Sequence, residues 1–163
     1  MPVMAEDVRH YCVQLAASAL GVGRARRSTN KVLLDWGLAE VVDVTEVLLT
    51  ELLTNVLVHV GPGAWHALTL LHDGDVLRVE VRDPSPRMPV RRVGDWEEES
   101  GRGLRMIDCM ATAWGAERLP PGKVVWFSCR TGRAARPGPC ADTVDAVVGT
   151  GVGAGRMRRA LPL

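Results

Sequence analysis

The sequence lacks the long apolar run that a membrane-spanning helix requires. Charged side chains interrupt every apolar stretch of the 163 residues well before about 18 residues, the length at which a run indicates a membrane helix. The first residues also lack the basic segment and the following apolar segment of a secretion signal. We therefore expect a cytoplasmic protein without a membrane anchor.

Cysteine is scarce, and its spacing fits neither a metal site nor a disulfide framework. The four cysteines form no C-x-x-C pair and have no histidine at metal-ligand spacing, which argues against zinc ligation. Because no export signal is found, reduced thiols are the expected state.

Net charge is small, but it is unevenly distributed along the chain. Residues 130–163 hold six Arg and two Asp, whereas residues 1–129 hold 14 basic and 17 acidic residues, and the only lysines are Lys31 and Lys123. The length suits one compact domain. We predict a mildly acidic domain over 1–129 and a basic, flexible Gly/Pro/Ala/Arg-rich tail over 130–163. The tail has no interleaved aromatic residues, so nucleic-acid binding is not expected.

Hydrophobic periodicity predicts an α/β (α+β) fold built on one sheet. Strands are expected over 11–16, 64–72, 76–82 and 123–129, and helices over about 22–36, over 43–60 and from 101 onward. This order predicts a two-layer sandwich in which helices pack on one face of a mixed, largely antiparallel sheet.

Local signals mark the ends and faces of these elements. Asp43 and Glu46 have the spacing of a capping-box pair at the start of the second helix. Asp73-Gly74-Asp75 predicts a hairpin turn between two strands. The arginines of the first helix are expected on its exposed side: Arg24, Arg26 and Arg27. One apolar face of the third helix is expected to hold Leu104, Ile107, Ala111 and Trp114.

Polar residues stand out on the apolar helix over 43–60. Glu51 and Asn55 lie four residues apart on one stripe, and His59 follows one step further. Burying a carboxylate there is costly unless it has a partner. Glu51 and Asn55 either form a structural hydrogen bond at a half-exposed edge, or they form a site in which Asn55 offers an oxygen to Mg²⁺ and Glu51 acts as a general base.

Two further features have both a structural and a functional interpretation. Asp83 shares the parity of the buried face of the strand over 76–82. It either starts a turn before a proline or accepts a hydrogen bond from an exocyclic amine such as that of adenine. The segment Gly101-Arg102-Gly103 either punctuates a loop or opens a helix whose backbone N–H groups face an anion.

Taken in order, these features resemble the Bergerat-fold ATPases, the superfamily of gyrase-type, heat-shock and histidine-kinase ATP sites. Within it, the chain looks most like the bacterial anti-sigma-factor serine/threonine kinases of the actinobacterial type. The similarity covers roughly residues 10–129.

The resemblance assigns roles to residues. Thr50–His59 matches the N box, which implies that Asn55 binds Mg²⁺ and that Glu51 activates the attacking hydroxyl. Asp83 and Ser85 match the adenine-contacting box, in which Asp83 receives the adenine amine. On the last strand, Val124 stands near that pair, where the family commonly has Thr.

The resemblance also assigns the phosphate-binding turn and the function. Gly101, Arg102, Gly103 and Leu104 match the glycine box whose backbone amides cap the phosphates. ATP and Mg²⁺ are the implied cofactors, and the implied activity is phosphorylation of a Ser or Thr on an anti-anti-sigma partner. A sigma factor is the implied second partner, and a homodimer is compatible with the family. The alternative is an ATP-binding regulator that sequesters a partner without phosphotransfer; the presence of Glu51 favours the kinase.

Overall fold

A computed structural model describes residues 8–89 and 110–132, which form a five-stranded sheet and two helices. The elements follow in this order: β1 (Arg9–Ala16), α1 (Ala19–Asp35), the 3₁₀ turn η1 (Ala39–Val41), α2 (Val42–Asn55), the π-helical turn η2 (Val56–Val60), β2 (Trp65–His72), β3 (Val76–Asp83), β4 (Ala113–Leu119) and β5 (Gly122–Arg130). Within these ranges, no helix combines the length and the apolar character needed to cross a membrane.

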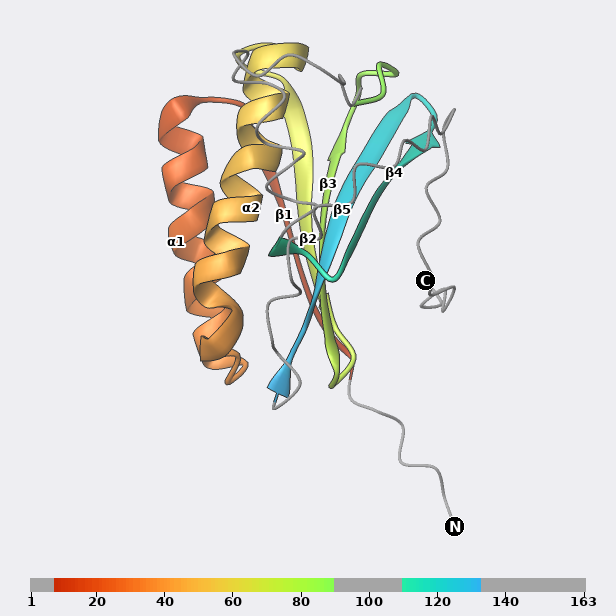
Figure 1. Ribbon diagram of the computed structural model, residues 1–163. Coiled ribbons are helices and arrows are strands. Elements are labelled where there is room, and N and C mark those ends of the chain that lie inside the picture. The colour runs from red at the N-terminus through yellow and green to blue at the C-terminus, as the bar shows by residue number, and fades with distance from the viewer. Residues whose placement is uncertain (1–7, 90–109, 133–163) are drawn as a thin grey trace.

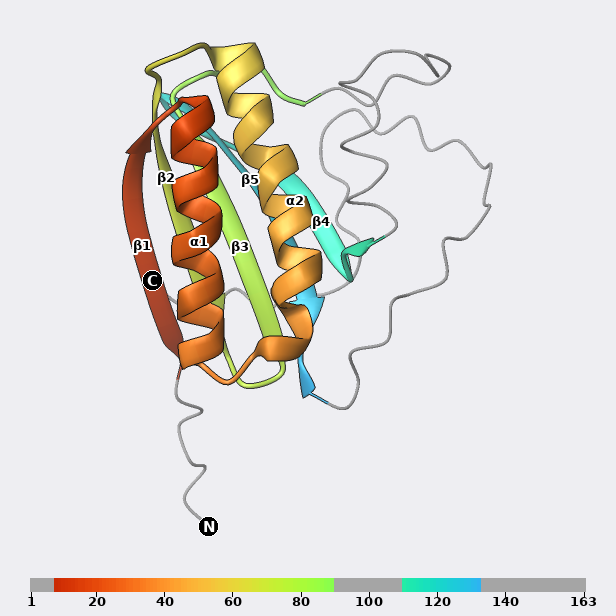
Figure 2. The same cartoon turned by 90° about the vertical axis from the view of Figure 1, so that its left-hand side faces the viewer.

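The strands form an open sheet in the order β1-β2-β3-β5-β4. Every neighbouring pair is antiparallel, so the parallel component of the predicted mixed sheet is not found in the described part. Figures 1 and 2 show both helices on the same face of the sheet, which confirms the predicted two layers. We call the other face, which carries neither helix, the open face.

The core lies between the sheet and the two helices. Residues of β2, β3 and β5 that face the helices are almost fully buried: Leu68, Leu70, Leu77, Val79, Val81 and Phe127. They pack against the apolar side of α2, formed by Leu48, Leu49, Leu52 and Leu53. Burying each such side chain contributes about 1.5–3 kcal/mol. The predicted alternation along the 76–82 strand is thereby confirmed.

The prediction of a helical face that includes Ala111 and Trp114 is wrong. The described helical segment ends at Met110, and Trp114 lies in β4, where it pairs with Phe127 of β5. Strand β4 is connected to β5 by the Pro120-Pro121 turn and pairs with it along its whole length. The pairing with β5 therefore determines the extended conformation of β4. Leu104 and Ile107 lie outside the described ranges.

The predicted capping box at the start of α2 is also wrong. The N-cap residue is Val41, which provides no side-chain hydrogen bond. Glu46 instead faces α1, where Arg26 forms an ion pair with it and Asn30 donates to Glu46 Oε2 at 2.8 Å. Arg26 is therefore half-buried and not on the exposed side of α1. A pairing between two helices has replaced the local cap.

The predicted C-terminal ends of the first two helices are confirmed, whereas β1 begins at Arg9 and α1 at Ala19, before the predicted residues 11 and 22. Helix α1 stops at Trp36-Gly37, where Gly37 adopts a φ of 77° that favours glycine. The helical run also reaches Val60, although its last five residues form the π-helical turn η2. The two described cysteines, Cys12 and Cys129, are free thiols. Burial raises the pKa of Cys129 to about 12.

Candidate functional site

The predicted site residues of α2 and β3 lie at one end of the molecule. Helix α2 packs against β3 and β5, and Figures 1 and 2 both place its C-terminal end beside the C-terminal end of β3. Because β3 and β5 are antiparallel, the end of β3 meets the start of β5, and Asp83 pairs with Lys123. We call this end of the sheet and helix layer the α2–β3 end.

Glu51 and Asn55 lie near the C-terminus of α2, and both are half-buried. The side chains make no hydrogen bond to each other or to any other described residue. The structural interpretation of the pair, a Glu–Asn hydrogen bond, is therefore not what the structure shows. His59 lies in the π-helical turn and is exposed. The polar atoms of Glu51 and Asn55 remain open to further interactions.

Asp83 is the last residue of β3, and its burial on the helix-facing side of the sheet is confirmed. It is only 4% exposed. Its Oδ1 atom accepts hydrogen bonds from the Ser85 backbone N–H at 2.8 Å and from Lys123 Nζ at 2.9 Å. No described residue donates to Oδ2. One oxygen of this buried carboxylate is thus held in place, and the other is without a protein partner in the described part of the chain.

Close approach of the β4–β5 turn to the end of β3 creates this arrangement. A Cβ atom at Gly122 would lie 1.9 Å from the carbonyl oxygen of Asp83 and 2.7 Å from Pro84 Cα. Only glycine lets the two strands pair here without displacement. The next residue, Lys123, is then directly opposite Asp83 and is 7% exposed.

Lys123 is a site residue that motif matching alone misses. Its Nζ donates to Asp83 Oδ1 and to the Ser85 carbonyl oxygen at 3.2 Å. One signal could have found it: Lys123 has the same parity as Val125 and Phe127, which belong to the core. A lysine on a buried strand face requires an acidic partner, and Asp83 is on the buried face of the neighbouring strand.

Val124 does not lie beside Asp83, contrary to the expectation from the resemblance. It pairs with Arg82, and successive side chains of a strand point to opposite faces. Val124 therefore lies on the open face, and the residue next to the Asp83 carboxylate is Lys123.

The segment after β3 is held close to the sheet. Ser85 contributes its backbone N–H to Asp83, and its Oγ accepts from the Arg87 N–H at 3.3 Å. Arg118 of β4 donates to the Pro86 carbonyl oxygen at 3.2 Å. Ser85, predicted to contact the nucleotide, thus positions Asp83 through its backbone.

The predicted phosphate-binding turn cannot be placed beside these residues. Gly101, Arg102, Gly103 and Leu104 all lie outside the described ranges. Within the ranges that are described, no group of three His, Cys, Asp or Glu side chains could hold a metal ion. The two predicted site residues at the end of α2, Asn55 and Glu51, both lie within the described ranges.

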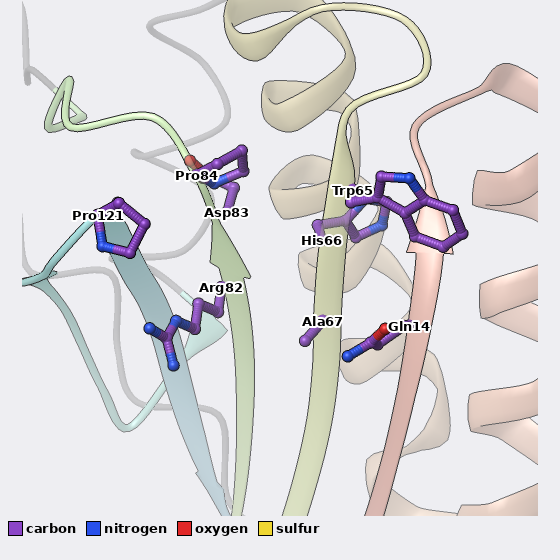
Figure 3. Close-up of a pocket in the computed structure, with 9 residues that line it drawn as sticks. Gln14, Trp65, His66, Ala67, Arg82, Asp83, Pro84 and Pro121 are labelled. Carbon is purple, nitrogen blue, oxygen red and sulfur yellow. The ribbon is translucent and has the colours of Figure 1, made fainter.

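A shallow groove of about 220 Å³ lies on the open face at the same end. Its lining includes Gln14, Trp65, Ala67 and Arg82, and Figure 3 shows these side chains around the ends of β1, β2 and β3. Neither Glu51, Asn55 nor Lys123 lines it. Asp83 does line it, together with Pro84 and Gly122, so the groove reaches the predicted nucleotide site at this one residue.

Comparison with known proteins gives one relative of similar sequence and no matching family model. The relative is an uncharacterized protein of Streptomyces coelicolor, 45% identical over 74 residues that make up 43% of this chain and 70% of the relative. Identity at this level over most of the relative's length shows common descent. The chain therefore belongs to the same family as this Streptomyces coelicolor protein.

Proposed function

We propose that the chain is an ATP-binding regulatory protein with the Bergerat fold, and that it acts as an anti-sigma-factor serine/threonine kinase. The observation that carries the proposal is Asp83: a buried carboxylate at the end of β3 with one oxygen fixed and one oxygen without a described donor. Glu51 and Asn55, which also lack described partners, come to the same end of the molecule from α2.

These residues fit Mg-ATP in their chemistry. The Asn55 side-chain oxygen is a hard donor of the kind that Mg²⁺ prefers. The Asp83 Oδ2 atom accepts hydrogen bonds only, which matches the exocyclic amine of adenine. The described part of the site contains a single buried cation, Lys123, which is already paired with Asp83. Charge neutralisation of the phosphates would therefore depend on Mg²⁺ and on groups outside the described ranges.

Bound Mg-ATP would supply the phosphoryl group that is transferred. Glu51 would accept the proton of an incoming Ser or Thr hydroxyl. A general base must lie within hydrogen-bond reach of the proton that it accepts, so the acceptor hydroxyl would have to approach the Glu51 carboxylate. A new bond would form between the hydroxyl oxygen and the γ-phosphorus, while the bond from that phosphorus to the β–γ bridging oxygen breaks and ADP leaves. Asn55 and Asp83 would take part only by positioning.

The proposed acceptor is a serine or threonine on a small anti-anti-sigma protein, and the proposed second partner is a sigma factor. This part of the proposal is supported by the order of the motifs around Glu51, Asn55 and Asp83. The alternative function keeps ATP binding but sequesters a partner without phosphotransfer. Only the role of Glu51 separates the two functions.

Nucleotide binding tests the site. We expect wild type to bind ATP in a Mg²⁺-dependent manner in isothermal titration calorimetry. Asn55→Ala should weaken this binding by about tenfold or more, because the side-chain oxygen that would bind Mg²⁺ is lost. Asn30→Ala is the control, since Asn30 lies on α1 and contacts Glu46 of α2 but not the site. Equal affinity of wild type and Asn55→Ala would contradict the assignment.

Phosphotransfer to anti-anti-sigma proteins of the same organism separates the two functions. Glu51→Ala should still bind ATP but should lose transfer of labelled phosphate to the acceptor. If wild type binds ATP and transfers no phosphate to any acceptor, the sequestering regulator is the correct function.

A further inference from the structure

The partner of Asp83 provides a second recognition group that neither the motifs nor the relative assigns. Lys123 Nζ lies 2.9 Å from Asp83 Oδ1 and 3.2 Å from the Ser85 carbonyl oxygen. An ammonium group has three N–H donors, and these contacts use two of them. The third has no acceptor among the described residues.

Burial makes this unused donor informative. The Asp83 and Lys123 side chains are 3% and 9% exposed, and a buried polar group normally has its hydrogen-bonding capacity satisfied. Asp83 Oδ2 is an acceptor without a described donor, and Lys123 Nζ is a donor without a described acceptor. Both belong to cross-strand neighbours on the same face of the sheet.

This pairing of acceptor and donor matches one edge of adenine. On its Watson–Crick edge, the exocyclic amine at C6 donates hydrogen bonds, and the adjacent ring nitrogen N1 accepts one. We propose that Lys123 is a specificity-determining residue for the base: it holds Asp83 by Oδ1, leaves Oδ2 for the amine, and donates to the neighbouring ring nitrogen. This inference rests on the proposed ATP-binding function and names its base-recognition group.

Three nucleotides and two lysine variants test the proposal. The nucleotides are ATP, 1-deaza-ATP, in which C–H replaces the ring nitrogen N1, and purine riboside triphosphate, which lacks the exocyclic amine. In calorimetry, wild type should bind each analogue about tenfold more weakly than ATP, which is the effect of losing one hydrogen bond to a charged group. Lys123→Met should bind ATP and 1-deaza-ATP equally, but it should still discriminate against purine riboside triphosphate through Asp83.

Lys31→Met is the matched control. Lys31 is the other lysine of the chain, and it is exposed on α1 in an ion pair with Asp35. This variant should discriminate among the three nucleotides as wild type does. Discrimination between ATP and 1-deaza-ATP that persists in Lys123→Met would overturn the inference and leave the proposed function intact. No ATP binding by wild type would overturn both.

A second variant is needed because Lys123→Met leaves the Asp83 carboxylate buried without its cation, which can prevent folding. The double variant Asp83→Asn/Lys123→Met removes both charges together, and far-UV circular dichroism checks its fold. The folded double variant should bind ATP and 1-deaza-ATP with equal affinity. A retained preference for ATP over 1-deaza-ATP would show that another group recognises the ring nitrogen, and the inference would be wrong.

Discussion

Gly122 is the residue whose size most directly controls the geometry of Asp83. A methyl group there would lie 1.9 Å from the Asp83 carbonyl oxygen and 2.7 Å from Pro84 Cα, and both are backbone atoms that cannot rotate away. We expect Gly122→Ala to lower the free energy of unfolding by about 1–3 kcal/mol, the usual cost of overpacking, or by more if β3 and β5 separate. Urea unfolding followed by tryptophan fluorescence measures this loss.

Gly23→Ala is the matched control for this substitution. Gly23 lies inside α1, and its nearest neighbour for an added Cβ is Arg27 Nη1 at 3.6 Å, which is ordinary contact. Alanine is the better helix former, so this variant should be more stable than wild type by up to about 1 kcal/mol. A Gly122→Ala protein that is as stable as wild type would show that the β4–β5 turn adapts to the methyl group.

At the residue scale, the sequence predicts which residues are buried better than what they contact. The parity of the 76–82 strand correctly places Asp83 on the buried face. The Lys123 contact depends on the register between β3 and β5, two strands separated by the 84–121 segment. Periodicity within each strand carries no information on that register. The same register explains why Val124, one residue away, is on the open face.

The helix pair depends on Glu46 as its main polar contact. The hydrogen bond from Arg26, and to a smaller extent the one from Asn30, lowers the pKa of Glu46 below its ordinary value of 4.5. A carboxyl group whose pKa is lowered on folding stabilises the folded state at pH values above its ordinary pKa. This stabilisation is lost as the pH falls through the pKa of the folded state. Wild type should therefore be more stable than Glu46→Gln at neutral pH, and this advantage should shrink below about pH 4.5.

Thermal melting of both proteins between about pH 7 and about pH 3 measures this difference. Glu117→Gln serves as a control, because Glu117 is exposed on β4. The melting temperature of this variant should follow that of wild type at every pH. An advantage of wild type over Glu46→Gln that does not change with pH would show that the ionised form of Glu46 is not what holds α1 to α2.

At the element scale, predictions succeed where a local signal and the tertiary fold agree. The hairpin at Asp73-Gly74-Asp75 is confirmed, with Gly74 at a φ of 98°, because its turn and flanking strands are encoded within a few residues. Strand β4 is missed because Ala111 and Trp114 also fit helical spacing. The capping box is wrong because Glu46 gains two partners from α1, a contact that local sequence does not encode.

At the scale of the whole molecule, residues just beyond the predicted domain end at residue 129 make contacts with the rest of the fold. These contacts lie at the end of the sheet opposite to the α2–β3 end. Strand β5 continues to Arg130. Thr131 is buried: its N–H donates to the Asp75 carbonyl oxygen at 2.9 Å, and its Oγ1 lies 3.0 Å from His72 Nε2. The Gly132 N–H donates to Glu40 Oε1 at 2.9 Å, a bond that lowers the pKa of Glu40.

Two shortened chains separate these contacts from the basic tail. A chain that ends at Gly132 keeps all three bonds and should match the full chain both in free energy of unfolding and in affinity for Mg-ATP. A chain that ends at Cys129 loses them, together with the hydrogen bonds from the Arg130 N–H to Thr112 Oγ1 and from Thr131 Oγ1 to the Gly74 carbonyl oxygen. It should be less stable by about 3–5 kcal/mol, since each hydrogen bond contributes about 1 kcal/mol. Urea unfolding and calorimetry measure the two quantities. Weaker Mg-ATP binding by the chain that ends at Gly132 would show that residues 133–163, and not only the α2–β3 end, take part in nucleotide binding.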